Sequence, residues 1–172
     1  MRRHLLTLSL VTGLLALTAC SEDGSGPKDA GLQLHDRTTA ADVGLPVYPG
    51  ATQRKPKEGE SGNGGSVGAW VGDFGLQVHA VQFESADTPD QVAAFYADQM
   101  SREGPVLDCR HPATRAKQPE GEPERLRCDD KVPPAGHFEF RVGEAKKFRV
   151  VHIEPQGDKE TRFEMVRIQI GR

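Results

Sequence analysis

Two His–carboxylate pairs have the residue types and the spacing best suited to chemistry in this sequence. His137 precedes Glu139 by two residues, and His152 precedes Glu154 by two residues. Because side chains two residues apart in a strand point to the same face, each pair would present an imidazole beside a carboxylate. Both groups are usual Zn²⁺ ligands. The same spacing also arises on ordinary solvated strand faces. We adopt that interpretation and expect no metal and no cofactor.

No familiar catalytic motif accompanies these pairs. The chain contains neither Gly-x-Ser-x-Gly nor His-Glu-x-x-His. The glycine-rich stretch from Gly59 to Ser66 neither follows a predicted strand nor opens a predicted helix, so we interpret it as a loop and not as a phosphate-binding site. We therefore expect no catalytic residues. An enzyme whose site is assembled from scattered His and acidic residues stays open as the alternative.

The first twenty residues, MRRHLLTLSLVTGLLALTAC, account for one of the three cysteines. A short basic segment precedes the apolar run Leu5–Leu17, which is typical of a secretory signal and too short to span a bilayer. The sequence Leu17-Thr18-Ala19-Cys20 resembles the lipobox of bacterial lipoproteins. The resemblance implies cleavage before Cys20, diacylglycerol on its thiol, and a further acyl chain such as palmitate. An ordinary signal peptide followed by a chance cysteine is the alternative.

The same resemblance predicts where the chain resides and how it is divided. Ser21 stands where lipoproteins retained in the inner membrane of enteric bacteria typically have Asp. It therefore implies the outer membrane in a source with two membranes, and otherwise the outer face of the cytoplasmic membrane. We expect a signal peptide over 1–19 and a lipidated cysteine with a flexible tether over 20–40, whose reach is roughly 25 Å. A single globular domain would occupy 41–172.

Cys109 and Cys128 remain once Cys20 is assigned to the lipid. Residues 106–110 and 124–128 are predicted to be strands, and the two cysteines fall on matching faces. If these strands pair, Cα atoms about 4.5–5.5 Å apart suit a disulfide, which an exported protein can keep. The spacing is not Cys-x-x-Cys, which argues against a redox-active thiol pair.

One helix is clearly predicted after Thr88, which we expect to be its N-cap. Pro89 suits the first helical position and Gln91 completes a capping box. The helix is expected to end at Gly104. Its apolar stripe is formed by Val92, Phe95, Tyr96 and Met100.

Short alternating runs predict strands on both sides of this helix. The first begins at Val67 and continues to Phe83, with a bulge expected near Ala80 because the apolar parity slips there. Further strands are expected at 106–110, 124–128, 137–142, 148–153 and 163–170. Short turns between them indicate antiparallel pairing. The predicted fold is α+β, an antiparallel β-sheet with one principal α-helix packed on it.

A second resemblance covers residues 45–104. PVYPGA, beginning at Pro46, followed later by FESADTPDQVAAFYADQM from Phe83, resembles a recurrent pattern in uncharacterised bacterial envelope proteins. That resemblance implies a helix packed on an antiparallel sheet, and it brings no catalytic residues.

Composition narrows the partners. The formal charge is −3 and becomes −5 when Arg2 and Arg3 leave with the leader, since −3 − 2 = −5. A net negative charge does not provide the basic surface that nucleic-acid binding requires. We expect a membrane-anchored lipoprotein of the cell envelope that acts as a non-catalytic binding or structural module for an envelope protein or a small ligand. Trp70, beside the glycine-rich loop, is the predicted contact residue; alternatively it fills the core beneath the helix.

Overall fold

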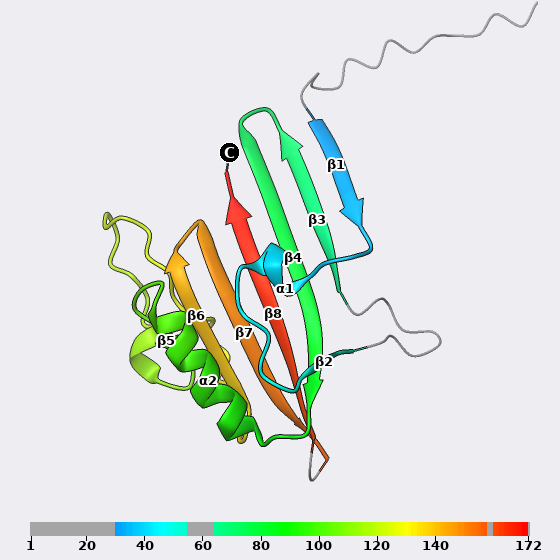
Figure 1. Ribbon diagram of the computed structural model, residues 1–172. Coiled ribbons are helices and arrows are strands. Elements are labelled where there is room, and N and C mark those ends of the chain that lie inside the picture. The colour runs from blue at the N-terminus through cyan, green and yellow to red at the C-terminus, as the bar shows by residue number, and fades with distance from the viewer. Residues whose placement is uncertain (1–29, 55–63, 158–159, 172) are drawn as a thin grey trace, which may run out of the picture.

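The computed structural model describes residues 30–54, 64–157 and 160–171 (Figure 1). The predicted signal peptide, Cys20, residues 21–29 of the predicted tether and residues 59–63 of the glycine-rich stretch lie outside the described residues. Within them, one antiparallel sheet carries two α-helices, so the fold is mainly β. It agrees with the predicted α+β class in the coarse sense of a sheet with a helix packed on it.

The sheet order is β1-β3-β4-β8-β7-β6-β5, and the short β2 also pairs with β4. The α-helices are α1 (Ala40–Val43) and α2 (Pro89–Ser101), and η1 (Pro112–Arg115) is a 3₁₀ turn. The strands are β1 (Ala30–His35), β2 (Thr52–Gln53), β3 (Gly64–Val71), β4 (Phe74–Ser85), β5 (Leu107–Asp108), β6 (Phe138–Glu144), β7 (Lys147–Gln156) and β8 (Glu160–Ile170).

The predicted helix is confirmed as α2. Thr88 is its N-cap, and Gln91 donates its backbone N–H to the Thr88 hydroxyl while its side chain reaches back to the Thr88 N–H. Residues Val92, Tyr96 and Met100 of the predicted stripe are fully buried against the sheet. Helix α2 lies over β6 and β7, and α1 lies over β4 and β8, on the same face (Figure 1).

The PVYPGA segment is fastened to α2 by two tyrosines. The buried Tyr96 hydroxyl donates to the Pro46 carbonyl and accepts from the Tyr48 N–H, both at 3.2 Å. Tyr48 in turn donates to Asp87 at 2.8 Å and meets Phe95 edge-on. Burial raises the pKa of Tyr96, so its hydroxyl keeps its proton. The two halves of the recurrent pattern are therefore in direct contact.

Four sequence interpretations need correction. Residues 30–35, placed in the tether, form the edge strand β1, because the alternation of Leu32 and Leu34 with smaller or polar residues satisfies a strand. The predicted strand at 124–128 is wrong: this segment has no ladder partner. Residues 64–66, placed in the glycine-rich loop, begin β3. The run from Val67 to Phe83, predicted as one strand, is a hairpin of β3 and β4 that turns at 72–73.

The predicted bulge near Ala80 is also wrong. Strand β4 pairs without interruption from Leu76↔Ile170 to Ser85↔Thr161. The parity slips because the apolar side chains change face while the backbone keeps its register. From Phe74 to Ala80 they point away from the helices, and from Val81 onward they point toward them.

The same change of face occurs at the same level in β8, which pairs with β4, and in β7, which pairs with β8. Each strand carries an apolar doublet there, and the members of the doublets are directly paired across the ladders. The inward members are Val81, Met165 and Val151, and the outward members are Ala80, Val166 and Val150. Over one half of the length of these strands, the apolar side chains are buried on the helix side. Over the other half, they point to the opposite side of the sheet.

Candidate functional site

The face of the sheet turned away from α1 and α2, here called the open face, carries a continuous apolar surface. It begins at the β3–β4 hairpin, residues 71–74, and ends at the doublets. We call it the apolar field, made of Leu32, Leu34, Val67, Val71, Phe74, Leu76, Val78, Phe148, Val150, Val166, Ile168 and Ile170. Five of these are strongly exposed: Leu32 and Leu34 at 66%, Phe74 at 61%, Val71 at 57% and Val67 at 43%. Contiguous exposed apolar patches on protein surfaces mark binding sites for proteins, membranes or ligands.

One described segment lies over part of this field. Residues 116–130, here called the overhang, cross the open face beside β6 and are tied down by the Cys109–Cys128 disulfide. Cys109 lies opposite Glu139 of β6, with its N–H donating to that carbonyl at 2.9 Å, which places it on the open face. The predicted Cys109–Cys128 pair is bonded in the structure, and the bond joins the edge of the sheet to an irregular segment.

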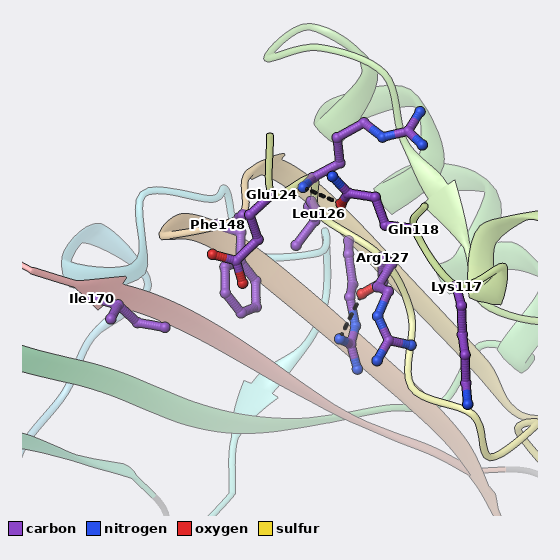
Figure 2. A pocket seen from close by; sticks show the side chains of 10 residues that line it. Lys117, Gln118, Glu124, Leu126, Arg127, Phe148 and Ile170 are labelled. Atoms are coloured by element: carbon purple, nitrogen blue, oxygen red, sulfur yellow. Dashed lines mark hydrogen bonds between the residues drawn. The ribbon is translucent and has the colours of Figure 1, made fainter. Parts of the chain in front are cut away.

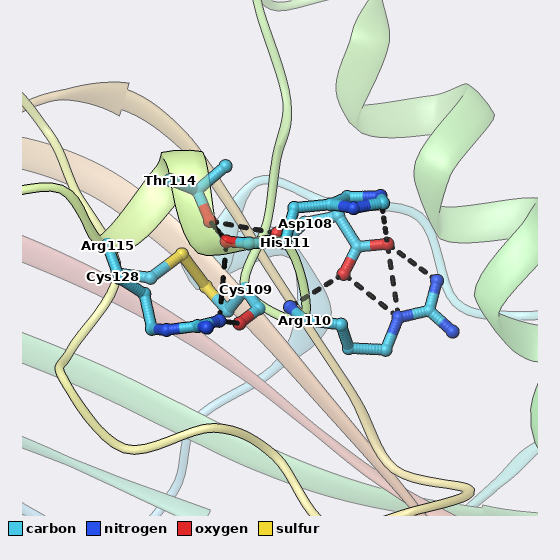
Figure 3. Close-up of polar contacts among 7 residues, drawn as sticks. All are labelled: Asp108, Cys109, Arg110, His111, Thr114, Arg115 and Cys128. Carbon is cyan, nitrogen blue, oxygen red and sulfur yellow. Dashed lines mark hydrogen bonds and ion pairs between the residues drawn. A yellow bond between two sulfur atoms is a disulfide. The ribbon is translucent and has the colours of Figure 1, made fainter.

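The turn around η1 sets the path of the chain into the overhang (Figure 3). The Thr114 hydroxyl donates to the carbonyls of Asp108 and His111, and Arg115 donates to the Cys109 carbonyl. Arg110 donates from Nε and Nη2, along one edge of its guanidinium, to both carboxylate oxygens of Asp108. Burial opposes ionisation of Asp108, but the side-chain and backbone hydrogen bonds from Arg110 outweigh it, so its pKa is lowered.

A second attachment comes from Arg141 of β6, whose side chain is only 11% exposed. Its guanidinium donates to the Arg127 carbonyl at 3.0 Å and to Asp129 at 2.7 Å, both in the overhang. It also pairs with Glu139. The hydrogen bond from Arg141 lowers the pKa of Asp129, which keeps this carboxylate ionised. The overhang is thus fixed by the disulfide, by the Arg141 cluster and by the hydrogen bond from the Cys128 N–H to the Thr114 carbonyl at 2.8 Å.

A cavity of about 500 Å³ lies between the overhang and the apolar field (Figure 2). This volume falls in the range of small-molecule sites, roughly 300–1,000 Å³. Its apolar wall is made by Leu126 of the overhang and by Phe148 and Ile170 of the sheet. Figure 2 shows Phe148 and Ile170 at the sheet, with Arg127 and Lys117 reaching down from the overhang.

The rim of the cavity is mainly cationic. Lys117, Arg125 and Arg127 line it from the overhang, against the single carboxylate of Glu124. Arg125 and Arg127 form ion pairs with Glu122 and Asp130, and all of these side chains are well exposed. Exposed pairs of this kind are weak, so the cations can exchange their partners for an anionic ligand.

At the other end of the open face, His137, His152 and Glu154 converge. One potential ligand atom from each lies within 4.8 Å of the others. Glu139, the other member of the first predicted pair, instead binds Arg141. Sequence spacing found each pair, but only the β6–β7 register shows that the two histidines meet.

Trp70 lies on the helix side of the sheet, away from the apolar field. Its ring covers Gly31 so closely that a Cβ there would lie 2.2 Å from a ring carbon. It is not part of the core cluster, so it does not fill the core beneath α2. It borders a hollow of about 280 Å³ with Gln33 and Gln77. A binding role for Trp70 stays a prediction.

No family model, curated protein or solved structure matches this chain. Among the described residues, no helix has the length and apolar character needed to cross a membrane.

Proposed function

We propose that this chain is a lipoprotein of the bacterial cell envelope, anchored through Cys20, and that it is a non-catalytic binding module. Its ligand is a small amphiphile with an apolar tail and an anionic head. The apolar field would hold the tail, and the cavity under the overhang would hold the head. The observation that carries this proposal is the matched change of face in three adjacent strands.

The change of face is what separates a binding surface from a poorly patterned sheet. An antiparallel sheet with one solvated face normally alternates apolar and polar residues along its whole length. Here Val78, Ile168 and Val150 point away from the helices, while Gln77, Arg167 and Arg149 take the helix side. Apolar side chains placed outward on three paired strands favour burial against a ligand.

Charge favours an amphiphile over a purely apolar ligand. Lys117, Arg125 and Arg127 stand where the apolar field ends under the overhang. Guanidinium groups bind carboxylate and phosphate in two-pronged geometry. A ligand that lies along the field from Phe74 toward Phe148 would bring an anionic head to these cations.

The position of the anchor fits a ligand taken from the membrane. Ala30 begins β1 ten residues after Cys20 and pairs with Val71, at the hairpin end of the apolar field. Ten residues span at most about 35 Å. A lipid on Cys20 would therefore hold this end of the sheet near the membrane surface, whether outer membrane or outer face of the cytoplasmic membrane.

The anchor is tested by labelling cells with radioactive palmitate. Label should enter the wild-type chain and be lost in Cys20→Ser, whose leader stays uncut. Equal labelling of the two chains would contradict lipidation at Cys20.

The ligand is tested in intact cells by photocrosslinking. A benzophenone amino acid replaces Val78, on the open face, or its neighbour Gln77, on the helix face, as the matched control. Mass spectrometry should find an adduct of lipid size at position 78 and not at 77. The adduct should decrease in Arg125→Gln and Arg127→Gln and persist in Lys131→Gln, a change outside the cavity lining. A protein adduct, or equal yields at 77 and 78, would contradict the proposal.

A metal-dependent enzyme is the second candidate function. It is favoured by the convergence of His137, His152 and Glu154. Turnover by the purified chain that disappears in His137→Ala and His152→Ala would replace the non-catalytic proposal.

A further inference from the structure

We propose that His137, His152 and Glu154 form a binding site for a divalent transition metal. The site lies on the open face, at the end away from the hairpin, and does not depend on the amphiphile. The two imidazole rings have centroids 5.9 Å apart, and one ligand atom from each of the three residues falls within a 4.8 Å group. Among the described residues, no other group of three His, Cys, Asp or Glu side chains converges in this way.

Strand register brings the three residues together. Phe138 pairs with Ile153, so continuing the ladder by one residue sets His137 opposite Glu154. His152 lies two residues from Glu154 on the same strand and face. His137 is itself placed by a turn, because its N–H donates to the Pro134 carbonyl at 3.0 Å and Gly136 takes a positive φ of 80°.

The carboxylate is held with one oxygen free for a metal. Glu154 Oε1 accepts from Gln156 Nε2 at 3.2 Å and from Arg162 Nη1 at 3.4 Å. Glu154 Oε2 is 3.8 Å from His152 Nε2. Bonds of about 2.0–2.1 Å in a tetrahedral zinc site put ligand atoms roughly 3.3 Å apart. Side-chain rotations that bring the ligand atoms together by up to about 1.5 Å, from 4.8 Å to roughly 3.3 Å, would close the site, while Gln156 and Arg162 supply the outer partners that metal-bound carboxylates require.

The surrounding charge favours a cation. In the ladders His152 stands between Glu139 of β6 and Glu164 of β8. Together with Glu154 these make three carboxylates, against the two guanidinium groups of Arg141 and Arg162. The cluster therefore keeps an excess of negative charge for a divalent ion to neutralise.

Two imidazoles and one carboxylate suit Zn²⁺, Ni²⁺ and Cu²⁺, with Cu²⁺ expected to bind most tightly. Three protein ligands leave at least one coordination position for water or an outside ligand. A cavity of about 210 Å³, lined by residues that include His152, Glu154 and Glu164, adjoins this position.

The test uses the full chain, solubilised from membranes in detergent and freed of metal with a chelator. Zn²⁺ is titrated in competition with a chromophoric chelator, and one equivalent per chain is expected. His137→Gln, His152→Gln and the nearly isosteric Glu154→Gln should each weaken binding by more than the 10–100-fold typical of an outer partner. Gln156→Ala should weaken it by about 10–100-fold. The control His35→Gln removes an exposed histidine far from the group and should bind Zn²⁺ as the wild type does.

A second measurement reads the ligands directly. Electron paramagnetic resonance of the Cu²⁺ form should show coupling to two imidazole nitrogens, and to one in His137→Gln. Circular dichroism of each variant verifies that the sheet is intact. Absence of saturable Zn²⁺ binding, unchanged affinity in the His137 and His152 variants, or a Cu²⁺ spectrum unaltered by His137→Gln would overturn the site.

Discussion

Val150 and Val151 are neighbours in β7 that point to opposite faces, so one substitution made at both positions tests the change of face. Thr is the substitution of choice, because it keeps the β-branched shape that strands favour and exchanges a methyl group for a hydroxyl. Val151 pairs with Met165 and is fully buried beneath the helices. Val150 pairs with Val166 and is half-buried on the open face.

The expected difference follows from whether the hydroxyl can reach water. In Val151→Thr it is placed among apolar side chains without a partner, which costs about 1–3 kcal/mol. In Val150→Thr it is solvated, and a change at such a surface costs within about 0.5 kcal/mol. For a chain of this size about 2 kcal/mol lowers the melting temperature by roughly 4–8 °C. The two neighbours should therefore differ by several degrees.

Urea unfolding, monitored by circular dichroism, measures the free energy of unfolding of both variants. The comparison requires that the dependence of this free energy on urea concentration has the same slope in both. In the photocrosslinking assay, Val150→Thr should lower the yield of the lipid-sized adduct more than Val151→Thr does. The reason is that Val150→Thr introduces a hydroxyl into the apolar field and Val151→Thr does not. Equal destabilisation by the two substitutions would refute the reasoning, since it would mean that the open face is as buried as the core.

Three further predictions concern the fold. Cys109→Ser with Cys128→Ser should lower the free energy of unfolding by ~3 kcal/mol in urea, because a closed loop of 19-residue separation no longer restricts the unfolded chain; alkylation of both thiols in protein isolated without reductant would contradict the bond itself. Tyr96→Phe should cost about 1–3 kcal/mol in the same assay, because the part-buried Pro46 carbonyl and Tyr48 N–H both lose their hydrogen-bond partner; a neutral result would count against those hydrogen bonds. Asp108→Asn should destabilise the protein at neutral pH. The difference from wild type should vanish as the pH falls below about 3.9, the pKa of Asp in the unfolded chain, and then through the lowered pKa of Asp108 in the folded protein. A pH-independent difference would exclude the contribution of the Arg110 pair.

Features specified by adjacent residues could be predicted from the sequence. The capping box of α2 and the inward alternation of Phe138, Phe140 and Val142 both reside in a few consecutive positions, and both are present. The cysteine pairing followed from counting, although the predicted strand at 124–128 is absent. Pro123, directly before this segment, has no N–H to donate to a ladder, and the segment is attached instead by the disulfide and by Arg141.

The change of face could not be predicted from one strand alone. A slip of parity at Ala80 fits a bulge as well as a switch, because both place two apolar residues in succession. Only the alignment of Ala80 with Val166 and Val150 distinguishes them, and that alignment depends on ladders between strands far apart in sequence. The group of His137, His152 and Glu154 was also not predictable from one strand, because the β6–β7 register decides that His137 lies opposite Glu154.

The overhang forms the cavity but contributes nothing to the core cluster. No residue of the buried core cluster comes from 116–130, so the core under the helices does not depend on this segment. The wall formed by Leu126 and the cationic rim do depend on it. Without the Cys109–Cys128 bond, the overhang keeps the hydrogen bonds from Arg141 to the Arg127 carbonyl and to Asp129, and the Cys128 N–H bond to the Thr114 carbonyl, but it loses its covalent attachment to the sheet. Reduction of the Cys109–Cys128 bond should therefore loosen the overhang and open the cavity, while the core cluster, which contains no residue of 116–130, keeps its own contacts.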